Sequence, residues 1–217
     1  MHIPDGFLDI PTAVVTYAIF LLYGYYVIKK IRNSQFTEYV PFVSVLAAGI
    51  FAVQMLNWPL PGGTSLHFVG GGLAGIMLGP WLGFMAMFLV LLVQALVFHD
   101  GGITTLGANV INMAIVPVLI GYSIYWICIS KFKVTNSKKS IGAFLGAWLG
   151  ITIAGAIAGL QIGYSHSFPY GVSITLPIMA GWHAILGIIE GVITSFVILY
   201  LVHKAPHLIL TGGRVTK

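Results

Sequence analysis

Charged residues are scarce in this chain of 217 residues: Asp, Glu, Lys and Arg together make up 7%, while 58% of the residues are hydrophobic. A soluble domain of average composition has about 25% charged residues, so this chain cannot cover a water-facing surface. The single cysteine, Cys128, lies in an apolar run and indicates neither a disulfide framework nor a zinc cluster. The composition therefore predicts an integral membrane protein.

Motifs for covalent or nucleotide chemistry are missing as well. The sequence has no H-E-x-x-H zinc-protease helix, no G-x-S-x-G elbow and no P-loop. The stretch GGGLAG satisfies G-x-G-x-x-G, but no strand precedes it and no ribose-binding acid follows it, so we interpret it as a packing motif. The net charge of +5 comes from short basic clusters between apolar runs, which is typical of membrane topology rather than of nucleic-acid binding. These absences favour a protein that is not an enzyme.

Seven apolar runs predict an all-α integral membrane protein that forms a single transmembrane domain over residues 1–217. A straight span needs about 20 residues to cross about 30 Å of hydrocarbon, so the third run is short and the fifth has excess length. We expect Pro117 to kink the fifth helix, and Gly79-Pro80 to separate the third from the fourth, because a helix rarely runs smoothly through Pro. The expected spans are 11–28, 41–58, 66–79, 81–98, 103–130, 141–161 and 177–202.

Basic residues follow the first, fifth and seventh runs, and with seven spans all three clusters lie on one side of the membrane. The positive-inside rule makes that side cytoplasmic, with the N-terminus outside and the C-terminus in the cytoplasm. No Lys or Arg precedes Lys29, so the start of the chain is a poor match to a cleaved signal peptide. The basic residues are Lys29, Lys30 and Arg32; Lys131, Lys133, Lys138 and Lys139; and Lys204, Arg214 and Lys217.

Small and polar residues inside the runs predict how the helices pack. Glycines that recur at every fourth position form smooth stripes, on which two backbones can approach closely in lipid. These are Gly71, Gly75 and Gly79; Gly142, Gly146 and Gly150; and Gly155 and Gly159. Glu190 is the one carboxylate deep in a run, and it is either a functional residue or hydrogen-bonded structural glue. We interpret four amides as interhelical hydrogen-bond formers: Gln94, Asn109, Asn112 and Gln161.

The histidines divide between the two sides of the predicted bundle. His203 and His207 fall at the cytoplasmic end, where we expect them to contact solvent or headgroups. On or near the outer side lie His2, His67, His99, His166 and His183. One such histidine alone is usually a hydrogen-bonded residue, but several imidazoles on one face are consistent with a transition-metal site.

The chain starts MHIPDGFLDI, which places three nitrogen ligands close together. A free α-amine, the backbone nitrogen of residue 2 and Nδ1 of His2 can close a five-membered and a six-membered chelate ring on one metal ion. This chelate fills three positions of a plane and leaves room for one more nitrogen, provided that the metal displaces the amide proton. Ni(II) and Cu(II) favour square-planar nitrogen sites, whereas Zn(II) favours tetrahedral ones. The alternative is a His2 that only packs or caps, and Asp5 either helps to neutralise a cation or starts a turn.

Two motifs, MHIPDGFL at the start and PLPGGTSLHFVGG at Pro59 to Gly72, resemble those of a known family. They are similar to the nickel/cobalt substrate-specific membrane component (S component, NikM/CbiM type) of energy-coupling factor (ECF) transporters, over essentially the whole chain. The resemblance implies Ni(II) as the transported substrate and no organic cofactor. It also implies the ligands: the amine of Met1, the amide and imidazole of His2, and a fourth nitrogen from His67. Pro-Asp after the histidine is more typical of nickel than of cobalt proteins, and Co(II) uptake for cobalamin synthesis is the alternative.

The resemblance also implies partners, because uptake against a gradient needs energy and the chain has no nucleotide-binding motif. The expected partners are an ECF transmembrane coupling protein, cytoplasmic ABC ATPase subunits and a small accessory membrane subunit, in the plasma membrane of a prokaryote. Ala48 and Ala52 form a small-xxx-small pair that either contacts the coupling protein or packs within the chain.

Two other functions are alternatives to metal transport by a substrate-specific component. A membrane-embedded metal-dependent hydrolase that uses the outer histidines needs an open coordination position beside a general base, and no acid lies near His67 in the sequence. A proton-coupled secondary transporter with Glu190 as relay is favoured by inverted repeats, of which the sequence shows none.

Overall fold

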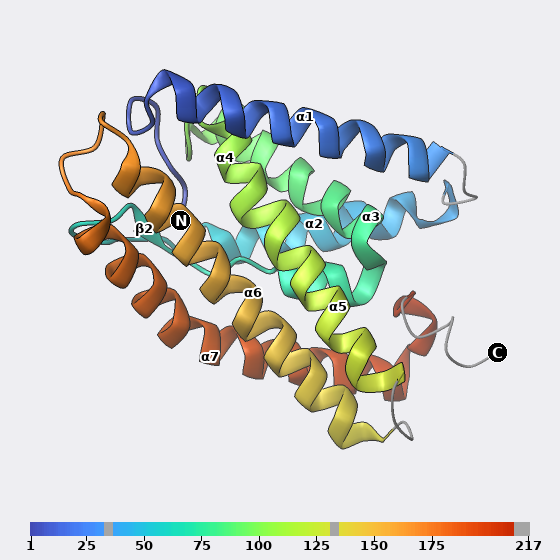
Figure 1. The fold of residues 1–217 in the computed structure, drawn as a ribbon. Helices are drawn as coiled ribbons and strands as arrows, with labels where there is room; N and C mark the ends of the chain where they lie inside the picture. Colours follow the sequence, from blue (N-terminus) through green and yellow to red (C-terminus); the bar gives the residue numbers. More distant parts are fainter. Residues whose placement is uncertain (33–36, 131–134, 211–217) are drawn as a thin grey trace.

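The computed structural model describes residues 1–32, 37–130 and 135–210, and it is an all-α bundle with one two-stranded ribbon (Figure 1). Five of its helices are long and apolar enough to cross a membrane, and α2 is a shorter apolar helix. The helices are α1 (Ile10–Arg32), α2 (Val40–Gln54), α3 (Gly71–Val93), α4 (Leu106–Val110), α5 (Val116–Ser130), α6 (Asn136–Tyr164) and α7 (Val172–Lys204). The short elements are β1 (Trp58–Pro59), β2 (Ser65–Leu66), π-helical turns η2 (Gln94–Phe98) and η3 (Ile111–Ile115), and 3-10 turns η1 (Thr37–Tyr39) and η4 (Pro206–Leu208).

The prediction of seven spans is met in part: α4, η3 and α5 form the one continuous segment expected over 103–130, but the helical segments number six in the described part of the chain, because the third and fourth predicted spans fall in one segment. The second predicted span runs too far: α2 ends at Gln54, and an extended loop with β1 and β2 fills residues 55–70. The predicted third and fourth spans both lie in α3, on either side of a backbone break at Gly79, whose φ is 77° and ψ −179°. The sequence predicts two separate spans over these residues, because Pro80 has no N–H with which to continue the helical hydrogen bonds.

The break at Gly79 turns the chain back on itself. A Cβ at Gly83 would lie 2.9 Å from the carbonyl oxygen of Ala74, a contact that a straight helix could not make across nine residues. The first half of α3 therefore ends inside the bundle, where its last carbonyl groups need donors. The backbone N–H of Leu210, beyond α7, donates to the carbonyl oxygen of Met77 at 2.8 Å and satisfies one of them.

The predicted glycine stripes hold helices together at short range. A Cβ at Gly146 on α6 would lie 3.0 Å from the carbonyl oxygen of Gly121 on α5. A Cβ at Gly159 would lie 2.9 Å from the carbonyl oxygen of Thr175 on α7. Any larger residue would push these helices apart, so the packing interpretation is confirmed. The predicted kink takes the form of the π-helical turn η3, which ends immediately before α5 and Pro117.

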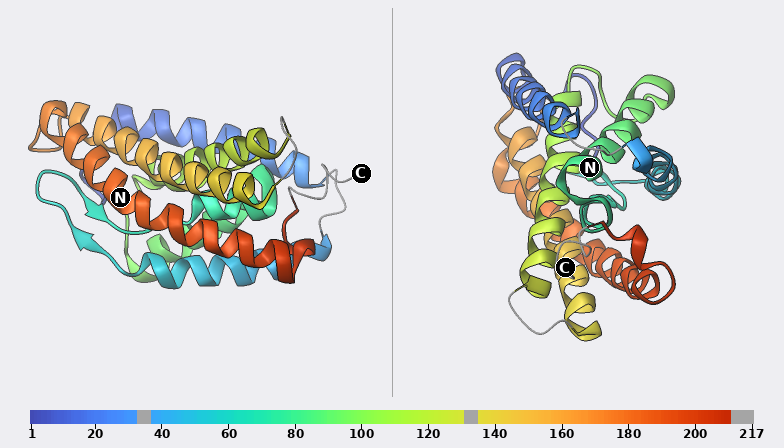
Figure 2. Two further views of the ribbon diagram at one scale, coloured as in Figure 1. Left: turned by 90° about the horizontal axis from the view of Figure 1, so that it is seen from below. Right: turned by 90° about the vertical axis from the view of Figure 1, so that its right-hand side faces the viewer.

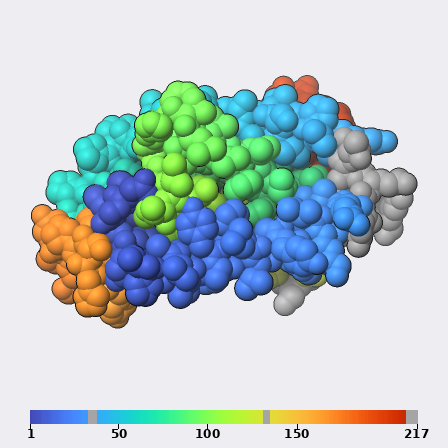
Figure 3. All heavy atoms as spheres, turned by 90° about the horizontal axis from the view of Figure 1, so that it is seen from above, coloured from blue at the N-terminus to red at the C-terminus, as the bar shows by residue number. Residues whose placement is uncertain are grey.

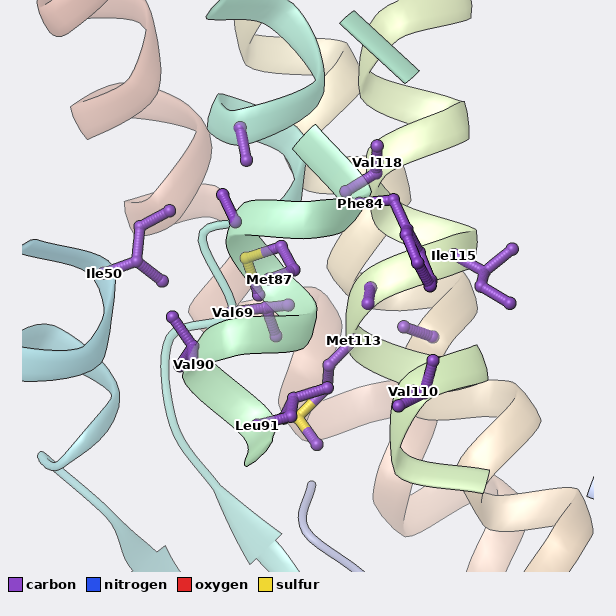
Figure 4. Packing of buried hydrophobic residues seen from close by; sticks show 14 of the residues in the cluster. Ile50, Val69, Phe84, Met87, Val90, Leu91, Val110, Met113, Ile115 and Val118 are labelled. Atoms are coloured by element: carbon purple, nitrogen blue, oxygen red, sulfur yellow. The ribbon is translucent and has the colours of Figure 1, made fainter. Parts of the chain in front are cut away.

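A buried cluster joins the loop before α3 to the middle of the bundle (Figure 4). Val69 belongs to this loop and is fully buried. Labelled members of the cluster from the surrounding helices are Ile50, Phe84, Met87, Val90, Leu91, Val110, Met113, Ile115 and Val118. The loop residues next to His67 thus rest on the apolar core rather than in solvent.

The two ends of the bundle differ in what they carry (Figure 2). The N-terminus and the β1–β2 ribbon lie at one end, and the ends of α1 and α7 and the start of α6 lie at the other. Lys29, Lys30 and Arg32, Lys138 and Lys139, and Lys204 belong to that second end, as the charge pattern predicts. The remaining basic residues of the prediction, Lys131, Lys133, Arg214 and Lys217, lie outside the described residues. Which end faces the cytoplasm stays a prediction.

Candidate metal centre

The N-terminal segment enters the bundle instead of extending into solvent. Met1 and Ile3 are fully buried, and His2 is 3% exposed. The amine of Met1 donates hydrogen bonds to the carbonyl oxygen of Ser65 and, at 2.6 Å, to its Oγ. Ser65 belongs to β2, which is paired with β1 and ends one residue before His67. The ribbon therefore brings the start of the chain next to the loop histidine.

The imidazole rings of His2 and His67 stack, with centroids 4.5 Å apart and an angle of 24° between their planes. His67 is fully buried, and its Nδ1 lies 2.7 Å from the carbonyl oxygen of Phe68. A carbonyl oxygen can only accept, so Nδ1 carries the proton and Nε2 keeps its lone pair. Nε2 of His67 is buried and has no hydrogen-bond partner in the described part of the chain. A buried lone pair without a partner is unusual in a folded protein and marks this nitrogen as a candidate binding atom.

Burial keeps these nitrogens neutral. It lowers the pKa of the Met1 amine well below its ordinary value, although the charge of Asp100 partly offsets this effect. Burial, followed by the charge of the amine, also lowers the pKa of His2 and of His67. At neutral pH the amine and both imidazoles are therefore unprotonated, which is the state that binds a metal ion.

Asp100 is the carboxylate nearest to the chelating end, and sequence reasoning missed it. Its Oδ2 lies 3.6 Å from Nε2 of His2. Burial raises the pKa of Asp100, while the nearby amine lowers it. The distance of 3.6 Å is too long for a hydrogen bond, and Nε2 of His2 has no hydrogen-bond partner in the described part of the chain, so the contact with Asp100 is electrostatic. The signal in the sequence was an acid followed by two glycines directly after an apolar run.

Ile3 is held on both sides of its backbone by residues that follow α3. Its N–H donates to Oδ1 of Asn109 at 2.9 Å. Its carbonyl oxygen accepts from Nδ2 of Asn109 at 3.1 Å, from Oγ1 of Thr105 at 2.5 Å and from the N–H of Gly102 at 3.0 Å. Figure 3 shows the blue N-terminal segment lying against the green segment of these residues. Asn109 therefore fixes the terminus rather than another helix, which corrects its predicted interhelical role.

Asp5 also binds the N-terminal segment to the residues that follow α3. Its Oδ1 accepts from the N–H of Thr104 at 2.7 Å and from Thr104 Oγ1 at 2.5 Å, and its Oδ2 accepts from the N–H of Ile103 at 3.2 Å. Asp5 thus anchors the N-terminal turn to the loop after α3. Gly101, with φ of 91°, allows the close approach: a Cβ there would lie 3.2 Å from Nδ1 of His2. The small residue keeps that nitrogen accessible.

His183 on α7 joins the surroundings of the cluster. It is fully buried, its Nδ1 donates to the carbonyl oxygen of Met179 at 2.6 Å, and its Nε2 has no hydrogen-bond partner in the described residues. A charge on His183 also lowers the pKa of His67, so the two imidazoles are close enough to interact. Within the described residues, no three side chains of His, Cys, Asp or Glu converge as a metal site.

The other histidines lie apart from this cluster. His99 and His166 are exposed, and the backbone N–H of His166 donates to Oδ2 of Asp9 at 3.2 Å. His203 lies at the opposite end of α7, where its Nδ1 donates to the carbonyl oxygen of Leu199 at 2.7 Å. His207 follows it and is also exposed. Of the five outer histidines, His2, His67 and His183 are buried, and the rings of His2 and His67 stack on each other.

Residues 2–208 match the family described as the CbiM cobalt uptake substrate-specific transmembrane region. The chain is a member of the CbiM/NikM family. It is therefore a substrate-specific transmembrane component of a cobalt or nickel uptake system and not an enzyme, as the missing catalytic motifs indicated.

Named relatives extend over most of this CbiM-family chain. It is 51% identical over 209 residues to the "Putative fused nickel transport protein NikMN" of Archaeoglobus fulgidus, covering 96% of this chain and 68% of that protein. It is 34% identical over 221 residues to the "Fused nickel transport protein NikMN" of Rhodobacter capsulatus, covering 96% and 64%. The whole chain superposes on a crystal structure of a transition metal transporter, covering 100% of both chains with a TM-score of 0.88 and 34% identity. The fused relatives associate this family with further transporter subunits.

Proposed function

We propose that this protein is the substrate-capture subunit of an ECF-type importer and binds Ni(II) at the end of the bundle that carries its N-terminus. The ligands in this proposal are the amine of Met1, the backbone nitrogen of His2, Nδ1 of His2 and Nε2 of His67. The observation that carries the proposal is the buried meeting of the amine with two stacked imidazoles. The relatives described as nickel transport proteins support the choice of metal.

The chemistry of this donor set favours nickel over zinc. Four nitrogens in a plane suit Ni(II) and Cu(II), whereas Zn(II) prefers a tetrahedral arrangement. The metal must displace the amide proton of His2, so the ligands together carry one negative charge against the two positive charges of the ion. Asp100, at 3.6 Å from the ring of His2, supplies the second negative charge and makes the buried centre neutral.

Transport needs partners that this chain does not contain. We propose a membrane coupling protein, cytoplasmic ABC ATPases and a small accessory membrane subunit in a prokaryotic plasma membrane, with the N-terminus outside. Ala48 and Ala52 of α2 support a docking role, because both are exposed. Uptake of Co(II) is the second candidate, since the matching family is described as a cobalt uptake region.

The deciding experiment is X-ray absorption spectroscopy on the nickel-loaded protein with its native N-terminus at neutral pH. We expect four nitrogen ligands in a plane, together with a diamagnetic, coloured centre. Six-coordinate nickel with oxygen ligands, or a sulfur ligand from Met1, would refute the proposed site.

A matched variant tests the amine directly. One residue added before Met1 converts the amine to an amide and moves the chelate away from the end of the chain, so nickel binding should be lost while the fold persists. A tagged protein that binds nickel as tightly as the native one would remove the amine from the ligand set. Titration of both proteins with Co(II) and Ni(II) in competition separates the two candidate substrates.

A further inference from the structure

Glu190 lies buried in the middle of α7 with an exposed fraction of 4%, and the metal chelate proposed above does not use it. Its two carboxyl oxygens accept hydrogen bonds from the backbone of a loop. Oε2 accepts from the backbone N–H of Val69 at 2.7 Å, and Oε1 accepts from the backbone N–H of Gly70 at 3.0 Å. Both donors belong to the loop that carries His67, only two and three residues beyond it. A carboxyl group from α7 therefore holds the loop that carries His67, one of the proposed nickel ligands.

Gln54, the last residue of α2, binds the peptide between Val69 and Gly70 from the other side. It is fully buried, and its Nε2 donates to the carbonyl oxygen of Val69 at 2.6 Å. The N–H and the carbonyl group of Val69 are thus both bound by side chains, one from α7 and one from α2. Val69 is itself fully buried in the core. The peptide between Val69 and Gly70 is thus bound on both edges, at its carbonyl oxygen by Gln54 and at its N–H by Glu190.

The loop passes beside an apolar cavity at this level, so its polar backbone groups are held by these two side chains. An apolar cavity of about 350 Å³ lies between α2 and α7, and its lining includes Gln54, Val69 and Glu190. Gly70 adopts a left-handed conformation with φ of 73° and leads directly into α3 at Gly71. A Cβ at Gly70 would lie 2.9 Å from the side chain of Ile50, so the chain passes close to α2 here. The two polar side chains therefore determine where the backbone after His67 lies.

We infer that Glu190 is a positioning residue for His67 and that Gln54 is its partner in this role. By fixing the peptide between Val69 and Gly70 they fix the start of α3 and the direction from which Nε2 of His67 reaches the metal. The inference rests on the proposed nickel site. Glu190 is then neither a proton relay nor general structural glue, since each of its oxygens is already committed to a backbone N–H of one loop.

The test uses the full chain with its native N-terminus, and nickel affinity is measured by competition with a chromogenic chelator. Glu190→Gln keeps the size of the side chain but turns an N–H₂ group toward one of two backbone N–H donors. We expect nickel affinity to fall about 10- to 100-fold, as it does when the support of a metal-binding histidine is removed. The absorption of planar nickel should fall as well, because Nε2 of His67 no longer completes the plane.

Gln54→Leu is a second variant with little risk to the fold. Oε1 of Gln54 has no hydrogen-bond partner among the described residues, so the substitution removes one unsatisfied group while it frees the carbonyl oxygen of Val69. We expect nickel affinity to fall about 2- to 10-fold, which corresponds to one neutral hydrogen bond. If Glu190→Gln yields no folded protein, this variant decides the question by itself.

Thr175→Val is the matched control on α7. Its Oγ1 donates to the carbonyl oxygen of Gly159 at 2.7 Å, so the substitution removes a buried hydrogen bond between α7 and α6 without touching the loop of His67. We expect lower thermal stability with nickel affinity unchanged. An equal loss of affinity in Thr175→Val and Glu190→Gln would reduce Glu190 to structural glue.

A double-mutant cycle identifies the route of the effect. In a His67→Ala background, Glu190→Gln should not weaken the residual nickel binding further, because the residue that it positions is gone. Equal losses in both backgrounds, or wild-type affinity and absorption in Glu190→Gln and Gln54→Leu, would overturn the inference. Failure of the wild-type protein to bind nickel would instead overturn the proposed function, so the two failures are distinguishable.

Discussion

Asn109 provides a direct test of how the N-terminal segment is seated. The substitution Asn109→Ala removes both hydrogen bonds to Ile3, one at 2.9 Å to its N–H and one at 3.1 Å to its carbonyl oxygen. The carbonyl oxygen keeps its bonds from Thr105 and Gly102, so the N–H of Ile3 is the group left without a partner. Because Ile3 is fully buried, water does not replace the lost acceptor.

The size of the effect follows from this single orphaned donor. A buried backbone N–H without an acceptor costs about 1–3 kcal/mol. The cost applies to the seated N-terminal segment and not to the helices, so it reduces the population that presents the amine beside Ser65. Converted to affinity, it corresponds to nickel binding that is about 5- to 150-fold weaker.

Asn112, three residues further along the same helical segment, is the matched control. It is also buried, and its Nδ2 donates to Oε1 of Gln161 on α6 at 2.6 Å, which confirms the interhelical role predicted for these two amides. Asn112→Ala should lower the free energy of unfolding without changing nickel affinity, because it does not contact the N-terminal segment. Comparing the nickel affinities of the two variants separates the effect of displacing the N-terminal segment from the effect of losing a buried amide side chain.

Two measurements on both variants check the reasoning. Nickel affinity is measured by chelator competition, and the reaction of the Met1 amine with an amine-selective reagent is followed without metal by mass spectrometry of the N-terminal peptide. In the wild-type protein the buried amine should react slowly, and in Asn109→Ala its rate should rise along with the loss of affinity. If Asn109→Ala and Asn112→Ala show the same nickel affinity and the same labelling rate, the hydrogen bonds from Asn109 to Ile3 do not hold the N-terminal segment in place.

Three further predictions concern the ligands and their protons. His2→Ala and His67→Ala should each lose nickel at concentrations that saturate the wild-type protein, whereas His203→Ala at the far end of α7 should retain it; metal analysis after gel filtration distinguishes them. Asp100→Asn should keep the four-nitrogen spectrum but bind nickel about 10-fold more weakly, because it removes the charge that faces His2; an unchanged affinity would argue against this role. Folding lowers the pKa of the Met1 amine and of the His2 and His67 imidazoles, so the unfolded chain binds protons more readily than the folded one. The metal-free protein should therefore lose stability as the pH falls below 8.0, the ordinary pKa of the amine, and then below 6.5, the ordinary pKa of the imidazoles. Thermal melts between pH 8 and pH 5 test this sign, and a melting temperature that rises toward pH 5 would contradict it.

Much of the fold is readable from the sequence because membrane helices are determined locally. Long apolar runs, basic clusters and glycine stripes all act within a single helix or its nearest neighbour, and the helices appear where these patterns place them. Even the separation at Gly79-Pro80 reflects a real break, since a Pro that follows a Gly with positive φ cannot continue a helix. The length of α2 was overestimated because the apolar residues of the following loop continue the same composition.

The surroundings of the candidate site were harder to predict. The two sequence motifs identify Met1, His2 and His67 as candidate ligands. The residues that hold the segments of these ligands in place lie far away in the sequence. Asn109 contacts Ile3 across 106 residues, and Glu190 contacts Val69 across 121. No local period relates such positions, and a buried amide or carboxyl in an apolar run has several partners of equal plausibility until the tertiary structure is known.

The bond between Leu210 and Met77 bears on how the protein is made. Ribosomes synthesise the chain from Met1 onward, so the first half of α3 enters the membrane long before the residue that caps its inner end exists. Glu190, which holds the loop at the other end of this half-helix, also belongs to the last long helix to be inserted. A nascent chain that has reached α5 thus contains every nitrogen of the proposed chelate, yet neither end of that half-helix is secured. Competence to hold the metal should therefore arise late in biogenesis, when the last helix and the segment after it have folded back into the bundle.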